Sequence, residues 1–467
     1  MKKILFLFIV HFCWTFSSPG QEIVHLSSRI NSILQRKELR GCISAIIVKD
    51  LDRDSILYSR YNKLNLHPAS TAKLFLAAAY LLDKNQLDSV CTVVTVSHKP
   101  GFDLITLSCG GDPLFSLEDM QKVVQSLQRY PLRKNRRVLV DCSLFDSIPY
   151  GPGWVWDDLP YYYAPPVLAF SINHNAFHVT VSGTLNGVRI NVSPDLPGIR
   201  VESMVSISGK DSLVFLKSPY SNTVIIKGTI RRGRKKKERF SLWNPPGTAL
   251  RILMAKTRAD SGFVTYDAPE PGYERDTLLV VSRSVSEILR YMLVKSDNLS
   301  AEMLCKLLSA RLGDLPGSIQ AGTRRVKGII ASEGLDTARI VLADASGMSC
   351  YDLTTPENLQ QLLERMWHSE KRSRFIDLLP RGGKEGTLKY RFRNIDGAGY
   401  IRAKTGTITG ASMLAGYVIL PHRAAISFTI FMQNFIGPAK TIRSIQDRIV
   451  EAIVQYAVKR PLKRSRK

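Results

Sequence analysis

The sequence lacks the signals of several common protein classes. After residue 20 it contains no apolar run close to the roughly 20 residues that a membrane-spanning helix needs. It has no tract of low complexity and no fixed repeat period, which argues against extended disorder and against a solenoid or propeller. We therefore expect a globular protein that is soluble or only peripherally attached to a membrane.

Patterns for metal binding and for a Ser-His-Asp triad are missing as well. No Cys-x-x-Cys, no His-Glu-x-x-His and no cluster of His or Asp ligands occurs in the 467 residues. No Gly-x-Ser-x-Gly motif is present, so we interpret His67 as structural rather than catalytic. The sequence therefore predicts no metal and no cofactor.

The N-terminus has the pattern of an export signal. Lys2 and Lys3 precede an apolar run that begins at Ile4 and extends through Phe16, and small residues follow up to Gly20. We expect residues 1–20 to be a signal peptide and the protein to reach the periplasm or cell envelope. A retained anchor is the alternative, although the run is short for a bilayer span. Six cysteines follow residue 20, an even number that permits disulfides in an oxidising compartment.

Acidic side chains are scarce compared with basic ones. There are 40 Asp and Glu against 65 Lys and Arg, a formal net charge of +25. Such a charge attracts polyanions, but export argues against nucleic acid and favours an anionic cell-wall or membrane surface. Basic residues are concentrated in residues 231–239 and in the tail from residue 459, although each of these is equally typical of a solvated segment.

Periodicity divides the chain into three parts. Residues 42–50 and 55–59 resemble paired strands, and a helix that is apolar on every side begins at Ser70. The middle, from about residue 92 to 276, has short alternating stretches, and Asn186-Gly187 predicts a type I′ hairpin there. The last part of the chain predicts helices over 285–293, 299–310 and 355–366. Strands over 412–419 and 424–432 and a final helix over 442–458 follow.

Three short motifs place reactive side chains in a fixed order. They are Ser70-Thr71-Ala72-Lys73, Ser296-Asp297-Asn298 and Lys404-Thr405-Gly406. Each motif alone is weak evidence, but the trio is typical of serine enzymes that form a covalent adduct with penicillin. We therefore expect acyl transfer through Ser70.

Acyl transfer needs a nucleophile, a base and donors for the oxyanion. Ser70 at a helix start has Lys73 one turn away on the same face. Lys73 must be neutral to accept a proton, and we expect burial and the nearby cation of Lys404 to lower its pKa. The backbone N–H groups of Ser70 and Thr407 are expected to form the oxyanion hole.

The other two motifs suit a proton relay and substrate contacts. We expect Ser296 to pass a proton to the leaving nitrogen and the NH₂ group of Asn298 to hold the substrate amide oxygen; a plain helix-capping turn is the alternative. Lys404 and Thr405 suit a free carboxylate, and Gly406 leaves room for a substrate to run beside the strand.

On these motifs the chain resembles the low-molecular-mass class C penicillin-binding proteins, the D-alanyl-D-alanine carboxypeptidases and endopeptidases of peptidase family S13. The long separation of Ser70 from Ser296 is similar to the large insertion of that family, and further matches are Gly110-Gly111-Asp112-Pro113, Pro152-Gly153-Trp154, Tyr163-Ala164-Pro165 and Gly386-Thr387-Leu388. The resemblance implies a mixed α/β, β-lactamase-like catalytic domain in residues 21–95 and 275–467, interrupted by a strand-rich insertion over 96–274.

The resemblance also implies the substrate. The enzyme would remove D-alanine from peptidoglycan stem peptides, with cleavage of D-alanyl crosslinks as an additional activity, and β-lactam antibiotics would be covalent inhibitors. Asp157 or Asp158 is similar to an acidic residue of the family that pairs with the amino group of a diamino acid side chain. Cys350 stands where the family has an arginine for the carboxylate of that side chain, so the third stem residue stays open. Trp154 and Trp156 accompany this segment, with plain core positions as the alternative.

Two other functions remain open. One is a β-lactamase of the same fold, although the Glu-x-x-Leu-Asn segment that positions a water in class A β-lactamases is absent after Asn298. The other is a non-catalytic penicillin-sensing or wall-binding protein, which would need a link to a signalling partner.

Overall fold

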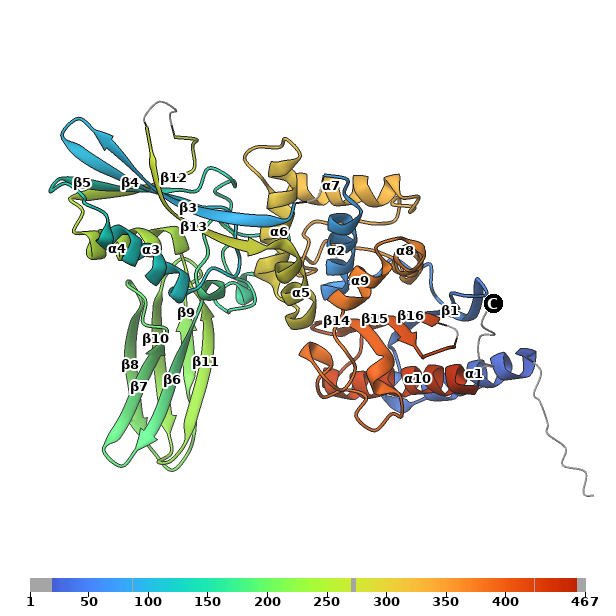
Figure 1. Ribbon diagram of the computed structural model, residues 1–467. Coiled ribbons are helices and arrows are strands. Elements are labelled where there is room, and N and C mark those ends of the chain that lie inside the picture. The colour runs from blue at the N-terminus through green and yellow to red at the C-terminus, as the bar shows by residue number, and fades with distance from the viewer. Residues whose placement is uncertain (1–18, 86, 270–273, 424, 460–467) are drawn as a thin grey trace, which may run out of the picture.

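The computed structural model describes residues 19–85, 87–269, 274–423 and 425–459. A body of helices around one sheet holds both ends of the described chain, and a strand-rich part extends from it (Figure 1). The expected signal peptide lies outside the described residues apart from its last two, and so does the basic tail beyond Lys459.

The central sheet joins the first and last strands of the chain. Its order is β14-β15-β16-β1-β2, and every neighbouring pair is antiparallel. The strands are β1 (Ile43–Asp50), β2 (Ser55–Arg60), β14 (Ile401–Ile408), β15 (Ala411–Ile419) and β16 (Ala425–Gln433). β14 lies at the edge of this sheet and packs against the 3-10 turn Ala69–Ala72, which carries Ser70.

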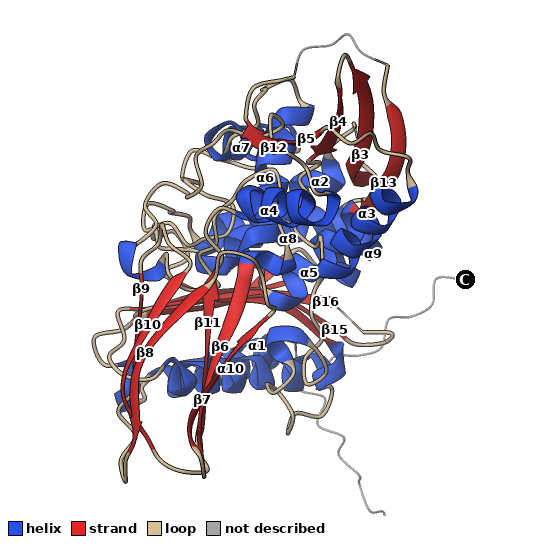
Figure 2. Ribbon diagram, turned by 90° about the vertical axis from the view of Figure 1, so that its left-hand side faces the viewer, coloured by secondary structure: helices blue, strands red, loops and turns tan. Residues whose placement is uncertain are grey.

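Helices cover both faces of the central sheet (Figures 1 and 2). One face packs against α1 (Pro19–Leu34) and α10 (Ala439–Lys459), which share an apolar core with the sheet. The other face holds a larger core with α2 (Lys73–Leu82), α5 (Val285–Lys295), α6 (Asn298–Arg311), α7 (Ile319–Ser332), α8 (Pro356–His368) and α9 (Arg372–Leu378). α2 is apolar on every side because neighbouring helices surround it. The expected α/β class is confirmed.

A second five-stranded sheet begins the extension. Its order is β12-β5-β4-β3-β13, with β4, β5 and β12 parallel to one another. The strands and the two helices beside them are β3 (Ser89–Lys99), β4 (Phe102–Ser108), β5 (Arg136–Asp141), β12 (Ser261–Thr265), β13 (Asp276–Ser284), α3 (Leu117–Arg129) and α4 (Pro245–Thr257).

Two three-stranded sheets form the far end of the extension (Figure 2). One has the order β11-β6-β7 and the other β8-β10-β9. Their strands are β6 (Ala176–Thr184), β7 (Gly187–Ser193), β8 (Arg200–Ile207), β9 (Val214–Lys217), β10 (Thr223–Ile230) and β11 (Lys235–Ser241). The hairpin expected at Asn186-Gly187 is present, but the expectation of a type I′ turn is wrong. Thr184 pairs with Gly187, and only Gly187 has positive φ (113°), whereas a type I′ turn needs positive φ at two residues.

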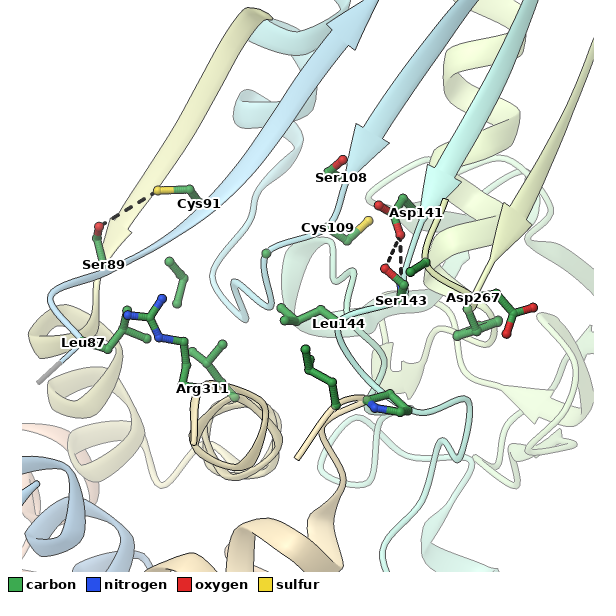
Figure 3. A pocket seen from close by; sticks show the side chains of 17 residues that line it. Leu87, Ser89, Cys91, Ser108, Cys109, Asp141, Ser143, Leu144, Asp267 and Arg311 are labelled. Carbon is green, nitrogen blue, oxygen red and sulfur yellow. Dashed lines mark hydrogen bonds between the residues drawn. The ribbon is translucent and has the colours of Figure 1, made fainter. Parts of the chain in front are cut away.

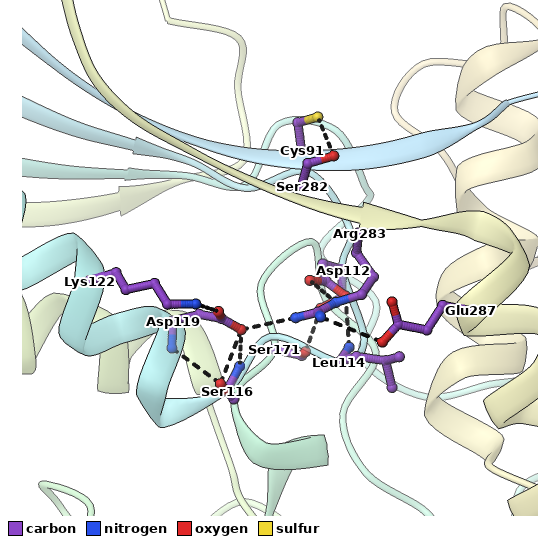
Figure 4. Close-up of polar contacts among 10 residues, drawn as sticks. All are labelled: Cys91, Asp112, Leu114, Ser116, Asp119, Lys122, Ser171, Ser282, Arg283 and Glu287. Carbon is purple, nitrogen blue, oxygen red and sulfur yellow. Dashed lines mark hydrogen bonds and ion pairs between the residues drawn. The ribbon is translucent and has the colours of Figure 1, made fainter.

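The expected domain boundaries do not coincide with the ends of strands. The boundary at residue 95 falls inside β3, and β13 begins just beyond residue 275 while pairing along β3. The change from one sheet to the other therefore lies near residues 88 and 285. Arg283, at the end of β13, joins the two parts through contacts with Asp112 at 3.4 Å, Asp119 at 3.0 Å and Glu287 at 3.5 Å (Figure 4).

Candidate active site

Ser70 and Lys73 lie where the chain enters α2. Ser70 belongs to a 3-10 turn, Ala69–Ala72, and Lys73 is the first residue of α2. The α-helical start expected at Ser70 is therefore a tighter turn, which brings residues three apart almost into line. Lys73 Nζ is 3.1 Å from Ser70 Oγ. Ala69 has a positive φ of 42°, which is uncommon for a residue with a Cβ and fixes the direction in which Ser70 enters the turn.

Ser296 and Asn298 lie in the turn between α5 and α6. Ser296 adopts a left-handed backbone (φ 58°) that ends α5, and Asp297 caps α6 by accepting the Ser300 N–H at 2.8 Å. The motif is therefore a helix-capping turn, and the same turn aims Ser296 and Asn298 at the lysines of the other two motifs.

The hydrogen bonds of the two lysines bring the three motifs together. Lys73 Nζ donates to Asn298 Oδ1 at 2.7 Å, and Lys404 Nζ donates to Ser296 Oγ at 2.7 Å. Lys404 Nζ also donates to the carbonyl of Thr405 at 2.6 Å. Both lysine side chains are fully buried. Residues far apart in sequence thus form one polar cluster around Ser70.

Both ends of the Asn298 amide have hydrogen-bond partners within the protein. The NH₂ group donates to the carbonyl of Tyr163 at 2.7 Å, while the oxygen accepts from Lys73. Asn298 therefore links Lys73 to the loop that carries Tyr163. One of the two hydrogens of this NH₂ group is therefore already bonded within the protein, which leaves the other for a substrate.

Burial lowers the pKa of Lys73 to about 8, and the carboxylates of Asp344 and Glu302 act in the opposite direction. The pKa of Lys404 is also lowered, first by burial and then by the charge of Lys73. The expectation that the pKa of Lys73 is lowered is correct, and burial is the main cause. The repulsion between the two lysines lowers the pKa of Lys404. The charges that act most on the pKa of Lys73 are acidic and raise it.

A buried carboxylate cluster beneath Lys73 was not expected from the sequence. Glu302 accepts the N–H of Ser346 at 2.7 Å, and the carbonyl of Ser346 accepts from Lys73 Nζ at 2.7 Å. Asp344 accepts the N–H groups of Gly347 at 2.6 Å and Ser349 at 2.8 Å. Burial, followed by the charge of Asp344, raises the pKa of Glu302 to about 8. The cluster holds the 344–349 loop so that the carbonyl of Ser346 faces Lys73.

Gly406 is required by packing against the nucleophile turn. A Cβ at this position would lie 3.0 Å from the carbonyl oxygen of Pro68 and 3.2 Å from the backbone nitrogen of Ser70. The missing side chain therefore makes room for the Ser70 turn. Thr405 is half-buried and Thr407 is exposed on the same edge strand.

One bond joins the loop before Tyr163 to the carboxylate cluster, and a second bond lies within the loop. Trp154 Nε1 donates to Asp344 at 2.8 Å, and the hydroxyl of Tyr163 donates to Asp158 at 2.8 Å. Asp157 is exposed. Trp156 is 58% exposed, so the core interpretation is wrong for this residue, whereas Trp154 is partly buried against the core.

A cavity of about 750 Å³ lies away from these motifs, where β4 and β5 end opposite α6 (Figure 3). Asp141, Ser143 and Arg311 line it, and none of the expected site residues does. His67 is also outside the polar cluster, since its Nδ1 lies 3.0 Å from the carbonyl of Asp352.

A model of the D-Ala-D-Ala carboxypeptidase 3 (S13) family matches residues 26–456. The chain belongs to this family. The resemblance drawn from the three motifs is therefore confirmed, and the match spans the central sheet, its helices and the whole strand-rich extension.

Relatives of the S13 enzyme cover most of its length. It is 27% identical to a D-alanyl-D-alanine carboxypeptidase of Actinomadura, over 94% of this chain and 86% of the relative. It is 25% identical to a D-alanyl-D-alanine carboxypeptidase of Haemophilus influenzae, over 90% of each chain. The crystal structure of penicillin-binding protein 4 from the same species has a TM-score of 0.80 at 23% identity and covers 92% of this chain and 99% of its own. That similarity supports the fold.

Three further features of the S13 chain concern metals, thiols and membranes. Within the described ranges, no three His, Cys, Asp or Glu side chains are grouped closely enough to hold a metal ion. The six cysteines after residue 20 are free thiols, with Cys109 and Cys142 sulfurs 3.8 Å apart. None of the helices in the described part of the chain has the length and apolar character to cross a membrane.

Proposed function

We propose that this S13 enzyme hydrolyses the terminal D-alanyl-D-alanine bond of peptidoglycan stem peptides through an acyl-enzyme on Ser70. The observation that carries the proposal is the 3.1 Å contact between Ser70 Oγ and Lys73 Nζ inside a buried cluster that also contains Asn298. A lysine with a pKa of about 8 is neutral often enough near neutral pH to accept the serine proton.

In the acylation step, Ser70 Oγ attacks the carbonyl carbon of the penultimate D-alanine while its proton passes to Lys73 Nζ. The backbone N–H groups of Ser70 and Thr407 stabilise the oxyanion. Ser296 passes its proton to the departing nitrogen and regains one from the lysine pair, through its bond to Lys404, so the proton that Lys73 took is used and free D-alanine leaves. Water then attacks the Ser70 ester and gives one proton to the again neutral Lys73, which returns it to Ser70 Oγ as the peptide leaves. The second hydrogen of the Asn298 amide holds the peptide oxygen.

Lys404, Thr405 and the edge strand β14 suit the C-terminal end of the substrate peptide. Lys404 and Thr405 attract the free carboxylate of the last D-alanine. The stem peptide runs along the outer edge of β14 beyond Ala403, as in other peptide-binding sheets, because the edge at Ile401 and Ala403 is already bonded to residues 380–382. Further along, Asp157 or Asp158 pairs with an amino group on the third stem residue. The enzyme acts outside the cytoplasm, after export.

β-Lactam antibiotics mimic this substrate and acylate Ser70. The absence of the glutamate segment of class A β-lactamases favours a slow release of the drug, and the S13 match favours peptide cleavage over drug hydrolysis. Cleavage of D-alanyl crosslinks is proposed as an additional activity of the same Ser70 site.

Defined muropeptides test the proposal directly. The purified enzyme is incubated with a monomeric pentapeptide and with a crosslinked dimer, and the products are identified by mass. Loss of one alanine from the monomer, absent in Ser70→Ala, supports the carboxypeptidase, and conversion of the dimer to monomers supports the additional activity. An unchanged pentapeptide with the wild-type enzyme contradicts the proposed function.

A further inference from the structure

Three turns of the extension meet at the end of the two three-stranded sheets, at the lower left of Figure 1. They are the β6–β7 turn near residue 185, the β8–β9 turn over 208–213 and the β10–β11 turn over 231–234. Arg234 O accepts from Gly183 N at 2.9 Å, and Ile230 O accepts from Ser208 N at 3.2 Å. We call this end, residues 183–189, 207–213 and 230–237, the basic tip.

The basic tip concentrates positive charge. Eight Lys and Arg stand in these three segments against a single carboxylate, Asp211. Asp211 pairs with Arg231 at 3.0 Å and lies 4.0 Å from Arg234, so one carboxylate is shared by two arginines. Arg232, Lys235 and Lys237 are exposed, and none of them forms an ion pair with another described side chain. Most of this charge is therefore directed to solvent.

An apolar side chain lies at the apex of the same tip. Leu185 is 83% exposed in the two-residue link between β6 and β7, beside the β10–β11 turn that carries Arg232 and Arg234. An exposed leucine gains nothing from a soluble polyanion. At a bilayer surface, in contrast, it enters the boundary between headgroups and acyl chains while the surrounding cations contact the headgroups.

We infer that the basic tip docks the enzyme on an anionic lipid bilayer. The tip holds none of the proposed catalytic residues, so docking leaves the Ser70 site free to act on its substrate. This surface is distinct from the catalytic function and does not depend on it. An acidic wall polymer is the rival partner, and the exposed Leu185 distinguishes the two.

Vesicle co-sedimentation of the purified chain tests the inference. We expect binding to vesicles of phosphatidylcholine with about one-third phosphatidylglycerol, little binding to phosphatidylcholine alone, and weakening as salt rises. Replacing Arg232, Lys235 and Lys237 together by Ser should reduce binding by about fivefold per charge. The matched control replaces the exposed Lys63, Arg324 and Arg339 on the other part of the molecule by Ser, with the same change of net charge. The terminal segments are identical in all variants.

A Leu185→Ser variant separates the bilayer from the acidic polymer. We expect its binding to anionic vesicles to fall several-fold at unchanged charge, and its thermal midpoint and peptide hydrolysis to match the wild-type values. Equal loss in the tip and control triple variants, or wild-type binding in Leu185→Ser, overturns the inference. So does a wild-type chain that sediments with neutral and anionic vesicles alike.

Discussion

The pKa of Lys73 sets the pH at which the nucleophile can be activated. Burial lowers that pKa to about 8, so Lys73 is mostly protonated below pH 8 and mostly neutral above it. Only the neutral amine can accept the Ser70 proton. The charge of Asp344 keeps the pKa of Lys73 from falling further, which places the transition close to neutral pH.

The rate of acylation by penicillin is therefore expected to rise with pH. Below pH 8 the second-order rate constant should increase about tenfold per pH unit, because one proton must leave Lys73, and it should level off above pH 8. Stopped-flow measurements with a fluorescent penicillin from pH 5.5 to 9.5 check this. A rate that is independent of pH across this range would show that Lys73 is not the base.

Asp344 acts on Lys73 only through charge and through the loop that it holds. Asp344→Asn removes a negative charge that raises the Lys73 pKa, so we expect the acylation profile to move toward lower pH. The variant also loses strong bonds to backbone N–H groups, at a cost of about 2–4 kcal/mol of unfolding free energy. Urea unfolding and the pH profile measure the two effects. The control is Asp336→Asn, an exposed loop carboxylate that accepts the backbone N–H of Ala338 at 2.9 Å.

At the scale of elements, the site depends on how closely β14 packs against the Ser70 turn. Gly406→Ala would place a methyl group 3.0 Å from Pro68 O and 3.2 Å from Ser70 N. Because the turn must shift, we expect acylation to fall at least tenfold, with a loss of about 1–3 kcal/mol in stability. Gly399→Ala is the control, since its new methyl group meets only the end of Lys384 at 3.7 Å. Equal effects of the two substitutions would contradict this account.

Local patterns explain which elements could be predicted from the sequence. The apolar residues around α2, the Thr355 cap of α8 and the alternation in β15 and β16 are signals that lie within single segments. The pairing of β3 with β13 joins segments almost 190 residues apart. No local signal marks such a pairing, so the boundaries of the extension were misplaced by several residues.

At the scale of the whole molecule, the order of the three motifs predicted the site better than any one segment did. Ser70, Ser296 and Lys404 meet because the first and last strands share one sheet, while α5 and α6 pack against α2, which follows the Ser70 turn. The buried Glu302 and Asp344 were not predicted as site residues. Glu302 lies on a helix that is buried on all sides, and only the tertiary structure reveals that the 344–349 loop lies beside it.

The central claim is that one residue, Ser70, forms both the peptide acyl-enzyme and the penicillin adduct. The most direct test is intact-protein mass spectrometry after mixing with a slight excess of benzylpenicillin, followed by a D-alanine release assay on a pentapeptide. We predict a long-lived one-to-one adduct that maps to Ser70 and abolishes D-alanine release, and neither adduct nor release in Ser70→Ala. Rapid return of the unmodified mass together with hydrolysed drug, or D-alanine release by Ser70→Ala, would contradict the account.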